Sequence, residues 1–165
     1  MLRRRRVVGE AAVDGRAGWA YVAGLLALRE GPVLEAAVRA LPAQPDVLLV
    51  DATGRDHPRG AGLALHLGAV LDIPTVGITH RPLLASGEWP AAEAKGSASP
   101  LRLGGETVGA WLRTRAGARP LAVHAGWRTD VECAIAVALA AARGHRTPDA
   151  LRAARRLARA ARGGA

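Results

Sequence analysis

The sequence has no phenylalanine and no asparagine, and only a single cysteine, tyrosine, methionine and lysine. A single cysteine excludes a disulfide framework and a cysteine-rich zinc site, and it is typical of a reducing compartment. No uncharged apolar run approaches the roughly 18 residues that a membrane-spanning helix needs. Residues 1–6 resemble the basic start of a signal peptide, but residues 7–15 contain two acids and supply no apolar stretch. We therefore expect a cytoplasmic protein without a membrane segment.

The composition and length indicate a small globular protein. A chain of 165 residues suits one domain and is long enough to bury a core, so we expect a single domain over residues 1–165. Hydrophobic residues make up 50 % of the chain, but alanine supplies many of them. Leucine and valine must therefore provide most of the core volume.

Positive charge is concentrated at the two ends of the chain. The formal net charge is +9, and four consecutive arginines, Arg3 to Arg6, form a basic arm. From Arg143 onward seven arginines stand against one acid, Asp149, so that the region between the two ends is nearly neutral. Basic ends of this kind suit the binding of phosphates. A solvated helix face is the alternative interpretation, and charge alone does not separate the two.

Apolar patterning predicts strands that alternate with helices. Proline beside acids in the run Arg29-Glu30-Gly31-Pro32 indicates a helix start, and the helical pattern continues to residue 41. A proline-, glycine- and serine-rich stretch predicts a loop over residues 81–100. The other predicted elements are strands at 7–13, 46–51, 74–79, 107–113 and 120–124, and helices at 62–71, 129–143 and 148–162. This order indicates an α/β domain with a partly parallel sheet.

The last predicted helix, residues 148–162, is strongly amphipathic. Four arginines at helical spacing share one face, and leucine and alanine share the other. The basic face consists of Arg152, Arg155, Arg156 and Arg159.

Asp51 is the first candidate for chemistry, because it directly follows a predicted buried strand. Open α/β sheets bind ligands at the carboxyl ends of their strands. A carboxylate held there can bind a hard cation such as Mg²⁺ through oxygen. The alternative is a turn or cap residue, which is the commoner role of an aspartate at a strand end.

Glu30, His57 and Arg59 extend this candidate site. Two carboxylates, an imidazole and a guanidinium suit metal-assisted hydrolysis of a phosphodiester, because the acids hold the ion and the imidazole transfers protons. Each residue also has a simpler interpretation. Glu30 favours the dipole of a helix start, and His66, among the apolar positions of the helix at 62–71, is a packing residue.

Several motifs in collinear order resemble the endonuclease V family, which contains the deoxyinosine-directed repair nucleases. Among them are Tyr21 to Pro32, the run Asp51-Ala-Thr-Gly-Arg-Asp-His57-Pro-Arg59-Gly, and the run Gly62-Leu-Ala-Leu-His66-Leu-Gly. The resemblance covers residues 7 to 160 or so and comprises the stretches 21–32, 45–60, 62–78, 96–101, 108–115 and 146–149.

The resemblance implies an RNase H-like mixed sheet flanked by helices. It also implies an enzyme that uses Mg²⁺, with Mn²⁺ as a substitute, to cut DNA on the 3′ side of deoxyinosine; inosine in RNA is a second possible substrate. By this resemblance Asp51 and Glu30 bind the metal, and His57 completes the catalytic cluster. Tyr21 matches the aromatic residue of a wedge that separates the strands at the lesion, and a damaged base costs less to unstack. His66 matches a histidine beside the site.

The chain departs from the family pattern at its beginning. The family opens with a strand that carries another metal-binding aspartate, and Asp14 lies too close to Tyr21 to replace it. In an RNase H-like sheet that strand is central and pairs with the strand before Asp51. Its loss would remove a metal ligand and leave backbone groups of a buried strand unpaired. We therefore expect an N-terminally truncated version of the fold.

Other departures lie near the expected nucleic-acid contacts. His80 stands where the family has lysine, which weakens a phosphate contact because histidine is shorter and mostly neutral at pH 7. The turn Gly126-Trp127-Arg128 replaces Gly-His-Arg, so that Trp127 either stacks on a base or caps the fold. Ala20 replaces the proline before the wedge tyrosine. With these changes we assign Tyr21, Arg59, His66, His80 and Arg128 to nucleic-acid binding.

Three explanations of the short chain remain open. It is a fragment from a start site assigned too late, a shortened relative that binds nucleic acid without cutting, or a poorly folded piece without activity. The joint presence of Glu30, Asp51 and His57 favours an enzyme. We predict a monomeric endonuclease for deoxyinosine-containing DNA, and the binding protein or gene fragment is the alternative.

Overall fold

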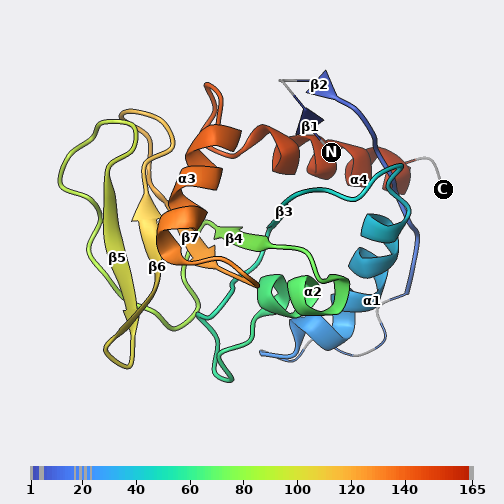
Figure 1. Ribbon diagram of the computed structural model, residues 1–165, viewed down its shortest axis with the longest axis horizontal. Coiled ribbons are helices and arrows are strands. Elements are labelled where there is room, and N and C mark those ends of the chain that lie inside the picture. Colours follow the sequence, from blue (N-terminus) through green and yellow to red (C-terminus); the bar gives the residue numbers. More distant parts are fainter. Residues whose placement is uncertain are drawn as a thin grey trace.

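A five-stranded mixed sheet forms the centre of the computed structural model, which describes residues 2–3, 6–16, 18, 20, 22 and 24–163. Its strands follow the order β3, β4, β7, β6, β5 from edge to edge (Figure 1). β3 and β4 are parallel, and the remaining neighbours are antiparallel. The strand bounds are β3 (Leu48–Val50), β4 (Thr75–Thr79), β5 (Ala98–Leu103), β6 (Glu106–Leu112) and β7 (Leu121–Ala125). The predicted α/β class with a mixed sheet is thus confirmed.

The helices cover both faces of the sheet, because apolar residues alternate along the strands. The described helices are α1 (Leu26–Arg39), α2 (Leu63–Leu71), α3 (Val131–Ala141) and α4 (Asp149–Gly163). Val76 and Ile78 of β4 pack with α3 and with Leu151 of α4 on one face. Val50 of β3 packs with α2 and the start of α1 on the other. No helix in the described ranges is long and apolar enough to cross a membrane.

A third apolar cluster lies under the long loop before β5. Trp111 of β6 donates its indole N–H to the carbonyl oxygen of Gly87 at 2.9 Å, and its ring meets Trp89 edge-on at 6.1 Å between centroids. Ala85 and Leu101 are buried with Trp111 in this cluster. The loop therefore covers the part of the sheet that α2 does not reach.

Two strand predictions were wrong. Residues 8–13 form no strand; a short hairpin of β1 (Leu2–Arg3) and β2 (Arg6–Val7) lies before them instead. Val8 is 45 % exposed, so its apolar side chain does not mark a buried strand. β5 was missed because Pro100 lies in its middle and suggested a loop. Proline is tolerated here because β5 is an edge strand and needs only one ladder of hydrogen bonds.

The first long helix begins earlier than the sequence indicated. α1 starts at Leu26, and its first turn contains no acid, so Glu30 lies in the second turn rather than at the N-terminus. Pro32 lies inside the helix and removes one backbone hydrogen bond. Packing of Leu26 and Ala27 against the core around α2 compensates for that loss. The helix dipole therefore contributes little to the stability of the Glu30 carboxylate, because its effect is confined to the first turn.

Gly77 of β4 lies in close contact with the loop after β3. A Cβ at Gly77 would overlap the carbonyl oxygen of Ala52 and lie 3.3 Å from the Cβ of Ala64. We expect Gly77→Ala to lower the free energy of unfolding by about 2–3 kcal/mol, because overpacking forces the backbone apart. Urea denaturation measures this change.

Gly18 provides the matched control, since a Cβ there would meet no atom of the described residues within 4 Å. We expect Gly18→Ala to change stability by less than about 0.5 kcal/mol. A Gly77→Ala chain as stable as the wild type would contradict the packing described for this layer.

Candidate active site

Asp51 lies at the carboxyl end of β3, directly after Val50, where the parallel strand β4 also ends its course. Its carboxylate is not free. Oδ2 accepts hydrogen bonds from Nη2 of Arg155 at 2.6 Å and from Nε of Arg155 at 3.2 Å. The two side chains are 47 % and 35 % exposed, so the ion pair lies near the surface. It joins α4 to the end of β3 across 104 positions of sequence.

His80 follows β4 and brings a second arginine to the same edge. Nη1 of Arg146 lies 2.9 Å from Nδ1 of His80. Because a guanidinium only donates, Nδ1 accepts, and the neutral ring carries its proton on Nε2. Partial burial lowers the pKa of His80 first, the charges of Arg146 and Arg155 lower it further, and Asp51 opposes the shift. His80 is therefore neutral at pH 7 and offers an N–H donor beside Asp51.

Arg146 serves mainly as a support at this edge. Its Nε donates to the carbonyl oxygen of Arg119 at 2.6 Å, and its Nη2 donates to that of Pro120 at 2.8 Å. Together with His80, these contacts engage all three guanidinium nitrogens. Arg146 thus fixes the position of the residues just before β7 and the orientation of the His80 ring.

His57 is 8 % exposed and holds two segments together. The backbone N–H of Arg59 donates to Nδ1 of His57 at 3.2 Å, so Nε2 carries the proton and donates to the carbonyl oxygen of Gly24 at 3.1 Å. Nη1 of Arg59 donates to the same carbonyl at 3.3 Å. Both ring nitrogens of His57 are engaged, and the ring fixes the segment that leads into α1.

The remaining predicted catalytic residue does not join Asp51 in a metal cluster. Glu30 is 49 % exposed and pairs with Nε of Arg29 at 4.0 Å. Within the part of the chain that the structure describes, no group of three or more His, Cys, Asp and Glu could hold a metal ion. Because Arg155 already engages Asp51, these residues do not by themselves fit a magnesium site. Tyr21 lies outside the described residues.

The other predicted nucleic-acid contacts are dispersed. His66 of α2 packs against α1, where a Cβ at Gly31 would lie 3.5 Å from its ring. Arg128 lies at the other end of the strands from Asp51, in the turn that contacts Thr75 at the start of β4. Nη2 of Arg128 pairs with Asp72 at 2.9 Å, and its guanidinium lies 5.9 Å from the centre of the Trp127 ring. β4 is about 13 Å long and separates the end of the strands at Asp51 from the end at Arg128.

The backbone of Trp127 holds the turn before α3 against the start of β4. Its N–H donates to Oγ1 of Thr75 at 2.8 Å, and its carbonyl accepts the N–H of Thr75 at 3.0 Å. Thr75 in turn donates to the carbonyl oxygen of Ala64 at 2.8 Å. These contacts connect α2, β4 and the turn before α3. The indole N–H of Trp127 donates to Oδ1 of Asp72 at 3.4 Å, and this contact within the protein favours the structural interpretation of its side chain.

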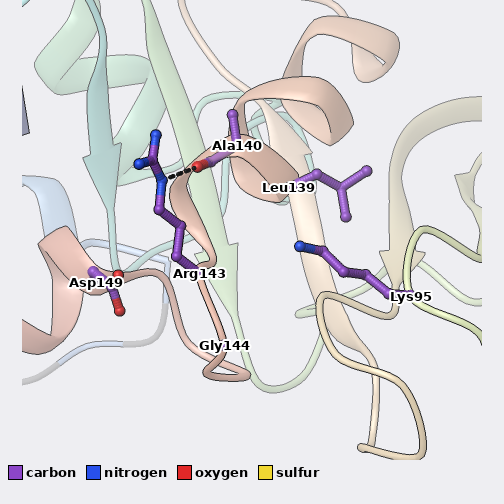
Figure 2. A pocket seen from close by; sticks show the side chains of 6 residues that line it. All are labelled: Lys95, Leu139, Ala140, Arg143, Gly144 and Asp149. Atoms are coloured by element: carbon purple, nitrogen blue, oxygen red, sulfur yellow. Dashed lines mark hydrogen bonds between the residues drawn. The ribbon is translucent and has the colours of Figure 1, made fainter. Parts of the chain in front are cut away.

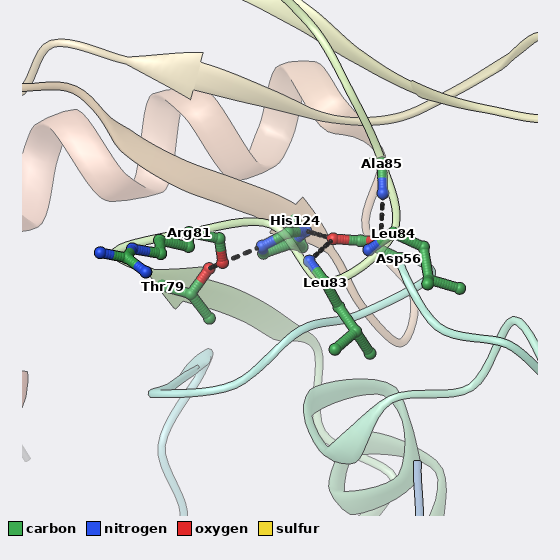
Figure 3. A network of polar contacts seen from close by, with 7 residues as sticks. All are labelled: Asp56, Thr79, Arg81, Leu83, Leu84, Ala85 and His124. Atoms are coloured by element: carbon green, nitrogen blue, oxygen red, sulfur yellow. Dashed lines mark hydrogen bonds and ion pairs between the residues drawn. The ribbon is translucent and has the colours of Figure 1, made fainter. Parts of the chain in front are cut away.

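The sequence did not indicate a buried polar network that joins Asp56, Thr79, Arg81, residues 83–85 and His124 (Figure 3). Asp56 is fully buried. Its carboxylate accepts the backbone N–H groups of Leu83 at 2.6 Å, Leu84 at 2.7 Å and Ala85 at 2.7 Å. This carboxylate fixes the loop before β5 to the loop that carries His57. No pattern in the sequence distinguishes Asp56 from a solvated loop acid.

His124 of β7 completes the network. Thr79 donates its hydroxyl to the carbonyl oxygen of Arg81 at 2.7 Å, so it accepts from Nε2 of His124 at 3.0 Å. Nδ1 of His124 is buried without a hydrogen-bond partner among the described residues and lies 4.0 Å from Oδ2 of Asp56. Burial lowers the pKa of His124 to about 4, although the negative charge of Asp56 opposes this shift. His124 is therefore neutral at pH 7.

A separate surface pocket of about 620 Å³ lies at the end of α3 (Figure 2). Nζ of Lys95 donates to the carbonyl oxygen of Ala142 at 3.4 Å, and Nε of Arg143 donates to that of Ala140 at 3.2 Å. Both cations thus satisfy carbonyl groups at a helix C-terminus. None of the residues predicted to be catalytic lines this pocket.

The chain is similar to a family of known nucleases over most of its length. The sequence model of the Endonuclease V family matches residues 2–156. The chain belongs to the endonuclease V family. Endonuclease V of Streptomyces avermitilis is 43 % identical over 155 residues, which are 94 % of this chain and 67 % of that protein. The resemblance drawn from the motifs is thus confirmed.

Solved structures of endonuclease V share the fold. The crystal structure of the Streptomyces avermitilis protein superposes with a TM-score of 0.85 at 41 % identity, over 90 % of this chain and 64 % of that chain. Ciona intestinalis endonuclease V, crystallised with DNA containing an inosine, superposes with a TM-score of 0.76 at 21 % identity, over 90 % and 69 % of the two chains. The chain spans about two thirds of the length of these relatives.

Proposed function

We propose that this chain acts as an endonuclease V-type nuclease that hydrolyses a phosphodiester bond on the 3′ side of deoxyinosine in DNA. Membership of the family supports this proposal most strongly. A relative of the same fold was crystallised with inosine-containing DNA. RNA containing inosine is proposed as a second substrate, and Mg²⁺, or Mn²⁺ in its place, as the cofactor.

The residues at the carboxyl ends of β3 and β4 are suited to binding a phosphate group. Asp51 is proposed as a metal ligand with Glu30, although Arg155 engages its carboxylate in the structure. His80 follows β4 and feels the charge of Asp51, and the Nε2–H of its neutral ring can donate to a phosphate oxygen. His57 acts as a positioning residue in this arrangement, because its ring holds the segment before α1.

One specific observation favours a second candidate function. The Asp51–Arg155 ion pair puts a positive charge where hydrolysis needs a free carboxylate. A chain with this pair intact would bind nucleic acid through α4 without cutting it. The two functions differ in turnover, not in binding.

Nicking of a labelled duplex with one deoxyinosine, in Mg²⁺ or Mn²⁺ and with EDTA as the metal-free control, tests the proposal. We expect the wild type to cut on the 3′ side of the lesion and to leave an undamaged duplex intact. Asp51→Asn should cut at least tenfold more slowly, a loss of about 1.4 kcal/mol in transition-state stabilisation. An inosine-containing RNA in the same assay tests the second substrate.

Asp46→Asn is the matched control, since Asp46 is an exposed acid at the other end of the β3 segment. We expect this variant to cut within twofold of the wild type. Failure of the wild type to cut in either metal would reject the nuclease. Retained binding of the same duplex would then support the second candidate.

A further inference from the structure

The guanidinium of Arg155 neutralises the carboxylate of Asp51, as a bound metal ion would. The guanidinium gives two N–H groups to the same oxygen, Oδ2, at 2.6 Å and 3.2 Å. Hydrogen bonds between ionised groups at such distances are the strong ones. The two N–H groups use both lone pairs of Oδ2, so a metal ion can bind this oxygen only by displacing Arg155. A metal ion on the other oxygen, Oδ1, would lie within a few ångströms of the guanidinium, and the two positive charges repel each other.

α4 delivers Arg155 to this position through its own packing. Leu151, one turn earlier, is 6 % exposed and buried in the core with α3. Arg152 pairs with Asp149 on the first turn at 3.6 Å. Arg155 therefore projects from an anchored helix, whereas Arg156, the next residue, is exposed and pairs with no acid among the described residues.

The surroundings of Asp51 also favour a monovalent partner. Arg146 is the second fixed positive charge at this edge, and His80, which it contacts, is neutral. A divalent ion at Asp51 would add two charges to this positive surrounding, and among the described residues Asp51 belongs to no group of three or more His, Cys, Asp and Glu that could hold the ion. Arg155 satisfies the same carboxylate with one charge.

We propose that Arg155 is the resident cation of Asp51 and competes with divalent metal ions for this carboxylate. Loss of Arg155 then raises the affinity of the chain for Mn²⁺ and Mg²⁺. This proposal rests on the proposed function in one respect, which is that Asp51 binds the metal ion. Metal binding is measured without DNA, so failure of the competition and failure of the nuclease are distinguishable.

Mn²⁺ binding to the full chain, followed by the electron paramagnetic resonance of the free ion, tests the competition. We expect Arg155→Gln to bind Mn²⁺ at least fivefold more tightly than the wild type. Arg155→Lys, which keeps the charge, should gain less than Arg155→Gln. Arg156→Gln removes the same charge from the same helix without touching Asp51, and should stay within twofold of the wild type. Arg155→Ala is measured beside these variants, so that the conclusion does not depend on one substitution.

The double variant Asp51→Asn with Arg155→Gln decides whether the gain occurs at Asp51. We expect the double variant to lose the tighter binding. Equal Mn²⁺ binding by the wild type and Arg155→Gln, including no binding by either, would overturn the proposal. An equal gain in Arg156→Gln would also overturn it, because the effect would then be one of net charge.

Discussion

An Asp56→Asn chain is expected to be about 3–5 kcal/mol less stable than the wild type. The buried carboxylate accepts three backbone N–H groups from residues 83–85, two of them on Oδ1 and one on Oδ2. An asparagine oxygen can keep the pair on one side, but its NH₂ group then faces the remaining N–H as a second donor. Buried donors without acceptors, and the loss of a charge-assisted bond, each cost about 1–3 kcal/mol.

Urea denaturation at pH 7 measures this loss, and Asp72→Asn is its control. Asp72 is 64 % exposed and pairs with Arg128 near the start of β4. Asparagine also tolerates the left-handed backbone of Asp72, which has φ of 54°. We expect Asp72→Asn to change stability by less than about 1 kcal/mol, as exposed ion pairs do. Equal losses in the two variants would contradict the role assigned to Asp56.

The second large effect is a loss of stability in acid that originates at His124. Its pKa is about 4 in the folded chain and about 6.5 in the unfolded chain, because burial disfavours the charged ring. Between these values the unfolded chain binds one proton that the folded chain does not. Stability therefore falls as the pH decreases from about 6.5 to about 4. The contribution of His124 to this loss is about 2 kcal/mol at pH 5.

His124→Gln isolates this contribution. The glutamine amide can still donate to Thr79 but does not titrate, so we expect its unfolding free energy to depend less steeply on pH below 6.5. His145→Gln removes an exposed histidine that pairs with Asp149 and should keep the slope of the wild type. Parallel pH curves for the wild type and His124→Gln would show that His124 does not cause the acid sensitivity.

The elements with continuous apolar runs or clear helical spacing were predictable. β4, α2 and α3 lie within a few residues of their predicted bounds, since their side chains face a core directly. β5 and the start of α1 were not. Pro100 and Pro32 are strong local signals for loops and helix starts, and tertiary packing overrode both.

The candidate site was predictable only in part. Asp51 lies at the carboxyl end of its strand as expected, because parallel strands bring their carboxyl ends to one edge. Arg155 belonged to a predicted basic face, yet nothing in the sequence indicated that one arginine of that face would pair with Asp51. Asp56 and His124 lie 68 positions apart in sequence, and their contact depends on β7 lying beside β4.

The order of motifs along the chain by itself determined the family, and the alternation of predicted strands with predicted helices determined the α/β class. Both can be identified from short stretches of sequence, because a motif and an apolar period each involve residues close together in the chain. Only the tertiary structure decided which charges meet. It placed Arg155 on Asp51, engaged both nitrogens of His57, and buried Asp56 under three backbone N–H groups. Such contacts depend on the packing of helices against a sheet, and a linear pattern of residue types does not specify that packing.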